Sequence, residues 1–151
     1  MTIAFLGTGL MGTGFVQRLR ATGQEVHVWN RGADKARRLE AHGARAFANV
    51  ADAVAGVDRI HLSLADDASV DAVLEPLADT LPAGRWIVDH TTTAVAPTAA
   101  RAARWEARGQ HFVHAPVFMG PANCAAGTGL MLLACTAARR DALMPALQTM
   151  T

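Results

Sequence analysis

Three glycines near the start of the chain have the spacing of a loop that binds phosphate groups. Gly7, Gly9 and Gly12 fit the pattern G-x-G-x-x-G, with a short apolar run before them and helical apolar spacing after them. The first glycine permits a tight turn, the second lets the backbone approach a diphosphate, and the third lets the helix pack against the strand. Amide groups at the helix start, together with the helix dipole, then bind the negative charge. Thr8, Leu10 and Met11 complete the expected phosphate site, and the alternative is a glycine turn without a ligand.

The residues after the second apolar segment indicate which dinucleotide this loop takes. A fold specific for NAD(H) usually has an acidic residue there, about 20 residues past the loop, which binds the ribose 2′-hydroxyl. This chain instead has the neutral Asn30 and then Arg31, whose guanidinium suits phosphate oxygens, and Lys35 adds a second charge one helical turn later. The pattern predicts NADP(H) rather than NAD(H) as cofactor, and it disfavours an S-adenosyl donor, which also needs the acid. The alternative for Arg31 is a solvated turn residue.

The elements that must position these residues alternate between short strands and helices. Such alternation is typical of βαβ units, whose right-handed crossovers place ligands at the carboxyl ends of parallel strands. We therefore expect an α/β fold of the Rossmann type, doubly wound, with a mainly parallel sheet in the order 3-2-1-4-5-6 and helices on both faces. Strands are expected at 2–6, 25–29, 44–47, 58–64, 86–89 and 112–117, with an extra strand near 130–134. Helices are expected at 10–21, at 34–42 with Asp34 as cap, at 49–55 with Asn49 as cap, from Asp66 and Asp67 to 80, at 97–108 and at 138–150.

Composition narrows the class of protein further. The 151 residues suit one domain, and 51% hydrophobic content with 18% charged residues argues against disorder. A net charge of +1 offers no electrostatic basis for nucleic acid or an anionic membrane as partner. No apolar run approaches the roughly 20 residues of a membrane span, and no signal peptide is visible, so we expect a cytoplasmic protein. Two cysteines, with Cys124 in an expected loop, and six scattered histidines indicate neither a disulfide framework nor a metal site.

Four motifs in order resemble the cofactor domain of the β-hydroxyacid dehydrogenases, the family of 3-hydroxyisobutyrate dehydrogenase, glyoxylate reductases and related imine reductases. They lie at 4–12, 29–31, 89–93 and 115–117, so the likeness covers nearly the whole chain. The resemblance implies an oxidoreductase that transfers hydride between NADPH and a small hydroxy acid, aldehyde acid or imine. It also implies cofactor contacts by Leu64 and Ala65 and by the hydroxyl of Thr92, for which a turn or cap role is the alternative.

The chain departs from the family pattern at two places. The hydroxyl residue that follows Asn-Arg in the family is replaced by Gly32, which removes one donor but keeps the main charge. The family's Ala-Pro-Val-Ser-Gly-Gly motif ends here in Phe118, Met119 and Gly120. Apolar surface therefore replaces groups that would hold a carboxylate, which favours an apolar carbonyl or imine as the small-molecule substrate. The alternative is that Phe118 and Met119 pack against another domain.

The catalytic residue is unknown from this sequence. The resemblance implies that the catalytic lysine lies on a long helix of an all-helical domain beyond Thr151, and Lys35 belongs beside the adenosine instead. His90 is a candidate general acid, although a polar residue at a strand end is the simpler interpretation. Hydride transfer needs the substrate held close to the nicotinamide. We therefore expect residues 1–151 to form an NADP(H)-binding domain that is inactive alone and dimeric only with the missing domain; the alternative is a non-catalytic dinucleotide-binding module or truncated remnant.

Overall fold

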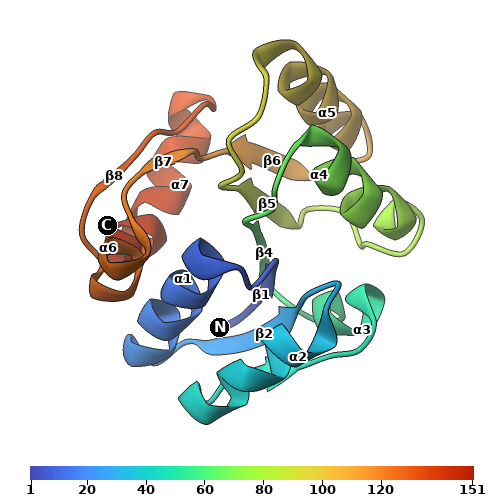
Figure 1. Ribbon diagram of the computed structural model, residues 1–151. Helices are drawn as coiled ribbons and strands as arrows, with labels where there is room; N and C mark the ends of the chain where they lie inside the picture. Colours follow the sequence, from blue (N-terminus) through green and yellow to red (C-terminus); the bar gives the residue numbers. More distant parts are fainter.

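Six parallel strands form the central sheet of the computed structural model, which describes every residue from Met1 to Thr151 (Figure 1). The sheet order, β3-β2-β1-β4-β5-β6, is the predicted one. From β1 the chain adds β2 and β3 on one side of the sheet and then β4, β5 and β6 on the other. The carboxyl ends of β1 and β4 therefore flank the topological switch point, where ligands bind in such folds. The strands are β1 (Thr2–Leu6), β2 (Glu25–Trp29), β3 (Arg45–Ala46), β4 (Arg59–Leu62), β5 (Trp86–Asp89) and β6 (His111–His114).

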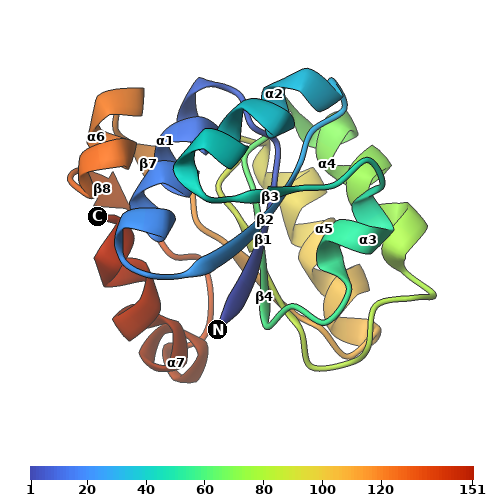
Figure 2. The ribbon, with the colours of Figure 1, turned by 90° about the horizontal axis from the view of Figure 1, so that it is seen from below.

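Helices cover both faces of the sheet, as predicted (Figure 2). Successive residues of β1 supply the two halves of the core: Ile3 and Phe5 pack with α1, whereas Ala4 and Leu6 pack with the opposite helices. Because side chains alternate across a strand, a strand covered on both faces is apolar throughout. One face carries α1 (Leu10–Ala21), α2 (Ala33–Arg37) with the 3-10 turn η1 (Arg38–His42), α6 (Pro121–Ala126), and α7 (Ala137–Leu147) with η3 (Gln148–Met150); the other carries α3 (Val50–Val54), α4 (Asp67–Leu74) with η2 (Glu75–Leu77), and α5 (Val95–Ala107). None of these helices is long and apolar enough to cross a membrane.

Several helix starts and stops differ from the prediction; α5 begins two residues earlier than expected, and the last turns of the helices predicted to reach residues 42 and 150 are the 3-10 turns η1 and η3. Gly32, not Asp34, is the cap of α2. Asn49 is the cap residue of α3, as predicted, although its side chain binds the Asp52 carboxylate at 3.2 Å instead of a helix amide. Asp66 does cap α4, accepting from the Ser69 amide at 2.8 Å. The helix predicted to reach residue 80 ends as α-helix at Leu74, because Pro76 lacks an amide and its ring crowds the preceding turn.

The segment after β6 departs furthest from the prediction. The strand expected to reach residue 117 ends at His114, and β7 (Val117–Phe118) pairs antiparallel with β8 (Leu130–Met131) in a separate two-stranded sheet. The extra strand predicted near 130–134 is therefore real but shorter, and it lies outside the main sheet. Helix α6 occupies the segment that was expected to be a loop, so Cys124 is a buried helix residue.

Helix α6 packs unusually close to α1. A Cβ atom on Gly14 of α1 would lie 2.6 Å from the carbonyl oxygen of Pro121 and 2.8 Å from Cβ of Cys124. Only a glycine leaves room for the backbone of one helix to approach the other at this distance. Gly14 is thus a packing residue.

We predict that Gly14→Ala lowers the free energy of unfolding by about 1–3 kcal/mol, because the added methyl group collides with α6. The gain in helix propensity, at most about 1 kcal/mol, does not offset this. Urea unfolding measures the change. Gly9→Ala is the control, since a Cβ there meets no protein atom within 4 Å, and equal losses for the two variants would contradict the packing argument.

Candidate dinucleotide-binding site

The glycine loop between β1 and α1 has the shape of an anion cradle. Gly7 has a φ of 96°, and a Cβ on it would collide with the carbonyl oxygen of Ser63. A Cβ on Gly12 would collide with the carbonyl oxygen of Gly7 itself. A Cβ on Gly9, in contrast, would have no protein atom within 4 Å. Two glycines are therefore needed for packing, and the third leaves open space at the first amides of α1, where a diphosphate fits.

Asn30 joins this loop to the end of β2. Its Oδ1 accepts a hydrogen bond from the Thr8 amide at 3.0 Å, and its Nδ2 donates to the Gly32 carbonyl at 3.0 Å. The amide of Gly7 donates to the Trp29 carbonyl at 2.9 Å. Thr8 is only 3% exposed, yet its hydroxyl has no hydrogen-bond partner in the protein. A buried hydroxyl without a partner is unfavourable, so this position fits a bound polar group.

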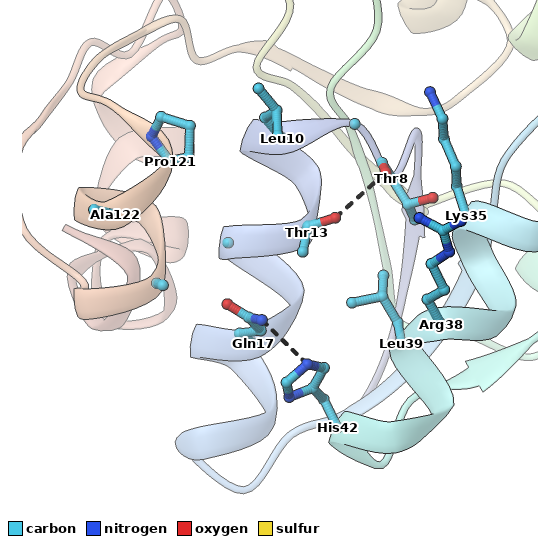
Figure 3. A pocket seen from close by; sticks show the side chains of 13 residues that line it. Thr8, Leu10, Thr13, Gln17, Lys35, Arg38, Leu39, His42, Pro121 and Ala122 are labelled. Atoms are coloured by element: carbon cyan, nitrogen blue, oxygen red, sulfur yellow. Dashed lines mark hydrogen bonds between the residues drawn. The ribbon is translucent and has the colours of Figure 1, made fainter.

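Arg31 and Lys35, the cations predicted to bind the phosphate on the ribose, lie beside this loop. Arg31 is exposed on the turn after β2, where its charge adds to the hydrogen bonds from Ser69 in lowering the pKa of Asp66. Lys35 lines a groove of about 530 Å³ together with Thr8 (Figure 3). Arg38 lines the same groove, although the sequence analysis did not select it. Its position one helical turn after Lys35, on the same face, was the available signal.

On the other side of the switch point, the ends of β4 and β5 place Leu64, Ala65 and Thr92. The Leu64 amide donates to the Thr91 hydroxyl at 3.0 Å, which joins the two segments. Thr91 is buried and its amide donates to the Asp89 carboxylate at 2.9 Å. Ala65 and Thr92 are exposed, and the Thr92 hydroxyl makes no hydrogen bond within the protein. It is therefore free to contact a ligand, whereas its two threonine neighbours serve the turn.

The three residues predicted to contact substrate have different surroundings. Phe118 is 67% exposed on β7. Met119 is half-buried against the α1 side of the core, and Gly120 is the cap of α6, its amide donating to Oδ1 of Asn123 at 3.1 Å. Of the three, only Phe118 presents a large apolar side chain to the surroundings.

His90 lies at the end of a buried hydrogen-bonded chain. Nε of Arg59 donates to Nε2 of His61 at 2.7 Å, Nδ1 of His61 lies 2.9 Å from Nε2 of His90, and Nδ1 of His90 lies 2.9 Å from the Ala115 carbonyl oxygen. Since each imidazole receives a donor at Nε2, each carries its proton on Nδ1. Burial lowers the pKa of His90 to about 4. Its only donor is used by the backbone, which favours a structural role over general-acid catalysis.

The two cysteines lie where burial raises the pKa of their thiols. Burial raises the pKa of the Cys124 thiol to about 11, so this group is a poor nucleophile. No three His, Cys, Asp or Glu side chains are arranged to hold a metal ion.

The sheet order, the glycine cradle and the open space at Gly9 together define a Rossmann-type dinucleotide-binding domain. Residues 2–151 match the family described as the NAD binding domain of 6-phosphogluconate dehydrogenase, and the chain belongs to this family.

Solved structures of dehydrogenases and reductases share this fold. Mycobacterium tuberculosis 3-hydroxyisobutyrate dehydrogenase with L-serine superimposes with a TM-score of 0.95 at 26% identity, over 99% of this chain and 52% of that one. A Streptomyces aurantiacus imine reductase gives 0.92 at 26% identity, over 100% of this chain and 53% of that one. Human cytokine-like nuclear factor N-PAC is 36% identical over 118 residues, which are 76% of this chain and 21% of N-PAC. The chain thus spans about half the length of these solved relatives, and the resemblance to the β-hydroxyacid dehydrogenases is confirmed.

We predict that acid destabilises the fold through His90. Above pH 6.5 the imidazole is neutral in both folded and unfolded chains, so its contribution is constant. As the pH falls from 6.5 towards 4, the unfolded chain binds a proton that the folded chain excludes, and stability is lost. A shift from 6.5 to about 4 corresponds to a loss on the order of 3 kcal/mol.

Urea unfolding between pH 7.5 and 4.5 measures this loss. His90→Phe should be less stable at neutral pH, because the Ala115 carbonyl loses its donor, but its stability should fall less steeply with acid. His42→Gln replaces an exposed imidazole and is the control. An identical acid slope in His90→Phe and the native chain would show that His90 does not cause the effect.

Proposed function

We propose that this chain binds NADP(H) and forms the cofactor-binding part of an oxidoreductase that transfers hydride between NADPH and a small carbonyl compound or imine. The tip of β2 supports the NADP(H) preference most directly. There the neutral Asn30 holds the Thr8 amide, and Arg31 and Lys35 lie where an NAD(H)-specific fold has an acid. A carboxylate at that point would repel a 2′-phosphate, whereas two cations attract it.

Each part of the proposed site has a separate task. The loop from Gly7 to Gly12 and the first amides of α1 bind the diphosphate, and Asn30 with the cations binds the phosphorylated ribose. Leu64, Ala65 and Thr92 line the path toward the ends of β4 and β5, where the nicotinamide binds. When bound, the nicotinamide ring supplies the hydride donor or acceptor, and the protein contributes orientation and electrostatics.

The proposed substrate is apolar at its reacting end. Phe118 offers an exposed aromatic side chain beyond the end of β6, and few charged groups accompany it. The relatives named as a 3-hydroxyisobutyrate dehydrogenase and an imine reductase agree with a carbonyl compound or imine as the substrate class. We propose that residues 1–151 are the cofactor domain and that a further domain supplies the proton donor, since His90 is buried and Lys35 lies on the α2 side. The free thiols of Cys124 and Cys135 agree with a cytoplasmic setting.

A non-catalytic dinucleotide-binding module is the second candidate. It is favoured by the likeness to N-PAC, which is named as a nuclear factor. Because residues 1–151 alone are expected to be inactive in either case, the test uses the full-length protein that contains them, incubated with NADPH and a panel of aldehydes, ketones and imines. NADPH binding without oxidation by that protein favours the module, and oxidation favours the enzyme.

We predict that Arg31→Gln weakens NADPH binding about tenfold and changes NADH binding little, because a charged hydrogen bond to the 2′-phosphate is lost. Calorimetric titration of both dinucleotides gives the ratio of affinities. Arg85→Gln is the control, since Arg85 precedes β5 and so lies at the opposite end of the sheet. A native chain that binds NADH as tightly as NADPH would refute the NADP(H) preference.

A further inference from the structure

We propose that Arg38 and Thr8 complete the 2′-phosphate clamp, so that the groove between α1 and α2–η1, and not the tip of β2 alone, determines the preference for NADP(H). This inference rests on the proposed function. It adds a specificity-determining arginine that neither the glycine pattern nor the turn after β2 contains, and it gives the hydroxyl of Thr8, a residue of the glycine loop, a second task.

The groove lies over α1, with α2 and η1 on one side and Pro121, Ala122 and Ala125 of α6 on the other. Thr13 and Gln17 line it from α1, and Lys35, Arg38 and His42 line it from α2 and η1. At its far end, Nε2 of Gln17 lies 3.2 Å from Nε2 of His42, which holds the walls together. At its mouth is Thr8, directly before the open space at Gly9. The groove therefore opens onto the place where the dinucleotide binds.

Both cations reach toward that mouth. Side chains on a helix lean toward its amino end, and the amino end of α2 follows β2 at the carboxyl edge of the sheet. Figure 3 shows the Arg38 side chain running along the helix to Thr8, whereas the Lys35 side chain runs in the same direction and extends past Thr8. Arg38 begins one turn further from the loop than Lys35, but the length of an arginine side chain compensates for this turn. Two positively charged side chains therefore line the groove on the side of Thr8 that faces α2 and η1.

No negative group of the protein neutralises these charges. Neither Lys35 nor Arg38 forms a salt bridge, and no carboxylate lines the groove. The adjacent Arg37 differs, because it pairs with Asp34 at 3.0 Å. Two unpaired cations that face one opening repel each other, and a phosphate monoester with two negative charges relieves the repulsion.

Thr8 supplies a third group aimed at the same ligand. Its amide donates to Asn30, and its carbonyl accepts from the Thr13 hydroxyl at 3.3 Å, so its backbone is held from both sides. Its own hydroxyl is buried beside the groove without a partner. A fixed donor next to two mobile cations matches the three terminal oxygens of a phosphate monoester.

Binding of four ligands tests the inference. NADPH and adenosine 2′,5′-bisphosphate carry the 2′-phosphate, whereas NADH and AMP lack it. We predict that Arg38→Gln weakens the first two about tenfold and leaves the other two within about twofold. Thr8→Val, which keeps the shape of the side chain, should weaken the same two ligands about threefold, and Arg38→Lys should restore part of the loss. Arg37→Gln, one position away and outside the groove, should change none of the four affinities.

The outcomes separate this inference from the proposed function. If Arg31→Gln weakens NADPH binding but Arg38→Gln does not, the groove is not part of the clamp and NADP(H) binding stands. If Arg38→Gln weakens all four ligands equally, Arg38 does not read the 2′-phosphate and the inference is overturned. If the native chain binds none of them, the proposed function fails and the inference fails with it. A thermal unfolding curve for each variant identifies any loss that comes from misfolding.

Discussion

The contact between the end of β1 and the first turn of α1 sets the geometry of the whole site. Because Gly12 has no side chain, the first turn of α1 comes against the carbonyl of Gly7. Gly7 in turn lies against the backbone of Ser63 after β4, and its amide is bound to the end of β2. One crossing of backbone segments therefore brings the ends of three strands and the amino end of a helix to the same point. A side chain at Gly7 or Gly12 would separate them.

Polar contacts between neighbouring strand ends then fix the relative positions of the loops that form the site. Asn30 connects β2 to the loop, the Leu64 amide connects β4 to the turn after β5, and His90 connects that turn to the end of β6. Each contact joins segments that adjoin in the sheet but are distant in sequence. A site held in this way loses little conformational freedom when a ligand binds, so more of the contact energy is available as affinity.

Much of this arrangement could be predicted, because it depends on local patterns. Apolar runs separated by helical spacing indicate βαβ units, from which the Rossmann-type sheet order follows, and Gly7, Gly9 and Gly12 between a strand and a helix indicate the cradle. Helix α6 was missed although Pro121 at its start and Gly127 at its end were signals, because six residues show little periodicity.

The groove and the histidine chain were beyond sequence patterns for a different reason. Arg38 lines a groove only because α1 lies opposite it, and His61 contacts His90 only because β4 lies beside β5. Such pairs depend on which segments become neighbours, information that appears only once the sheet is assembled. The substrate region shows the same dependence, since Phe118 is exposed while the adjacent Met119 packs inward.

The proposed site has a positively charged half, at β2 and α2, and a second half, at the ends of β4 to β6, that lacks these cations. This division matches the two ends of the cofactor. An NADP(H) molecule carries its phosphates in the diphosphate and adenosine part, and the nicotinamide ring is comparatively apolar. In this chain the unpaired cations lie on the β2 and α2 side, whereas the segments after β5 and β6 expose Thr92 and Phe118, and His90 is buried and neutral. Most of the electrostatic binding energy would therefore arise far from the reacting carbon. A domain of this kind holds its cofactor independently of the reaction, so the chemistry can be set by whatever groups are placed over the nicotinamide end.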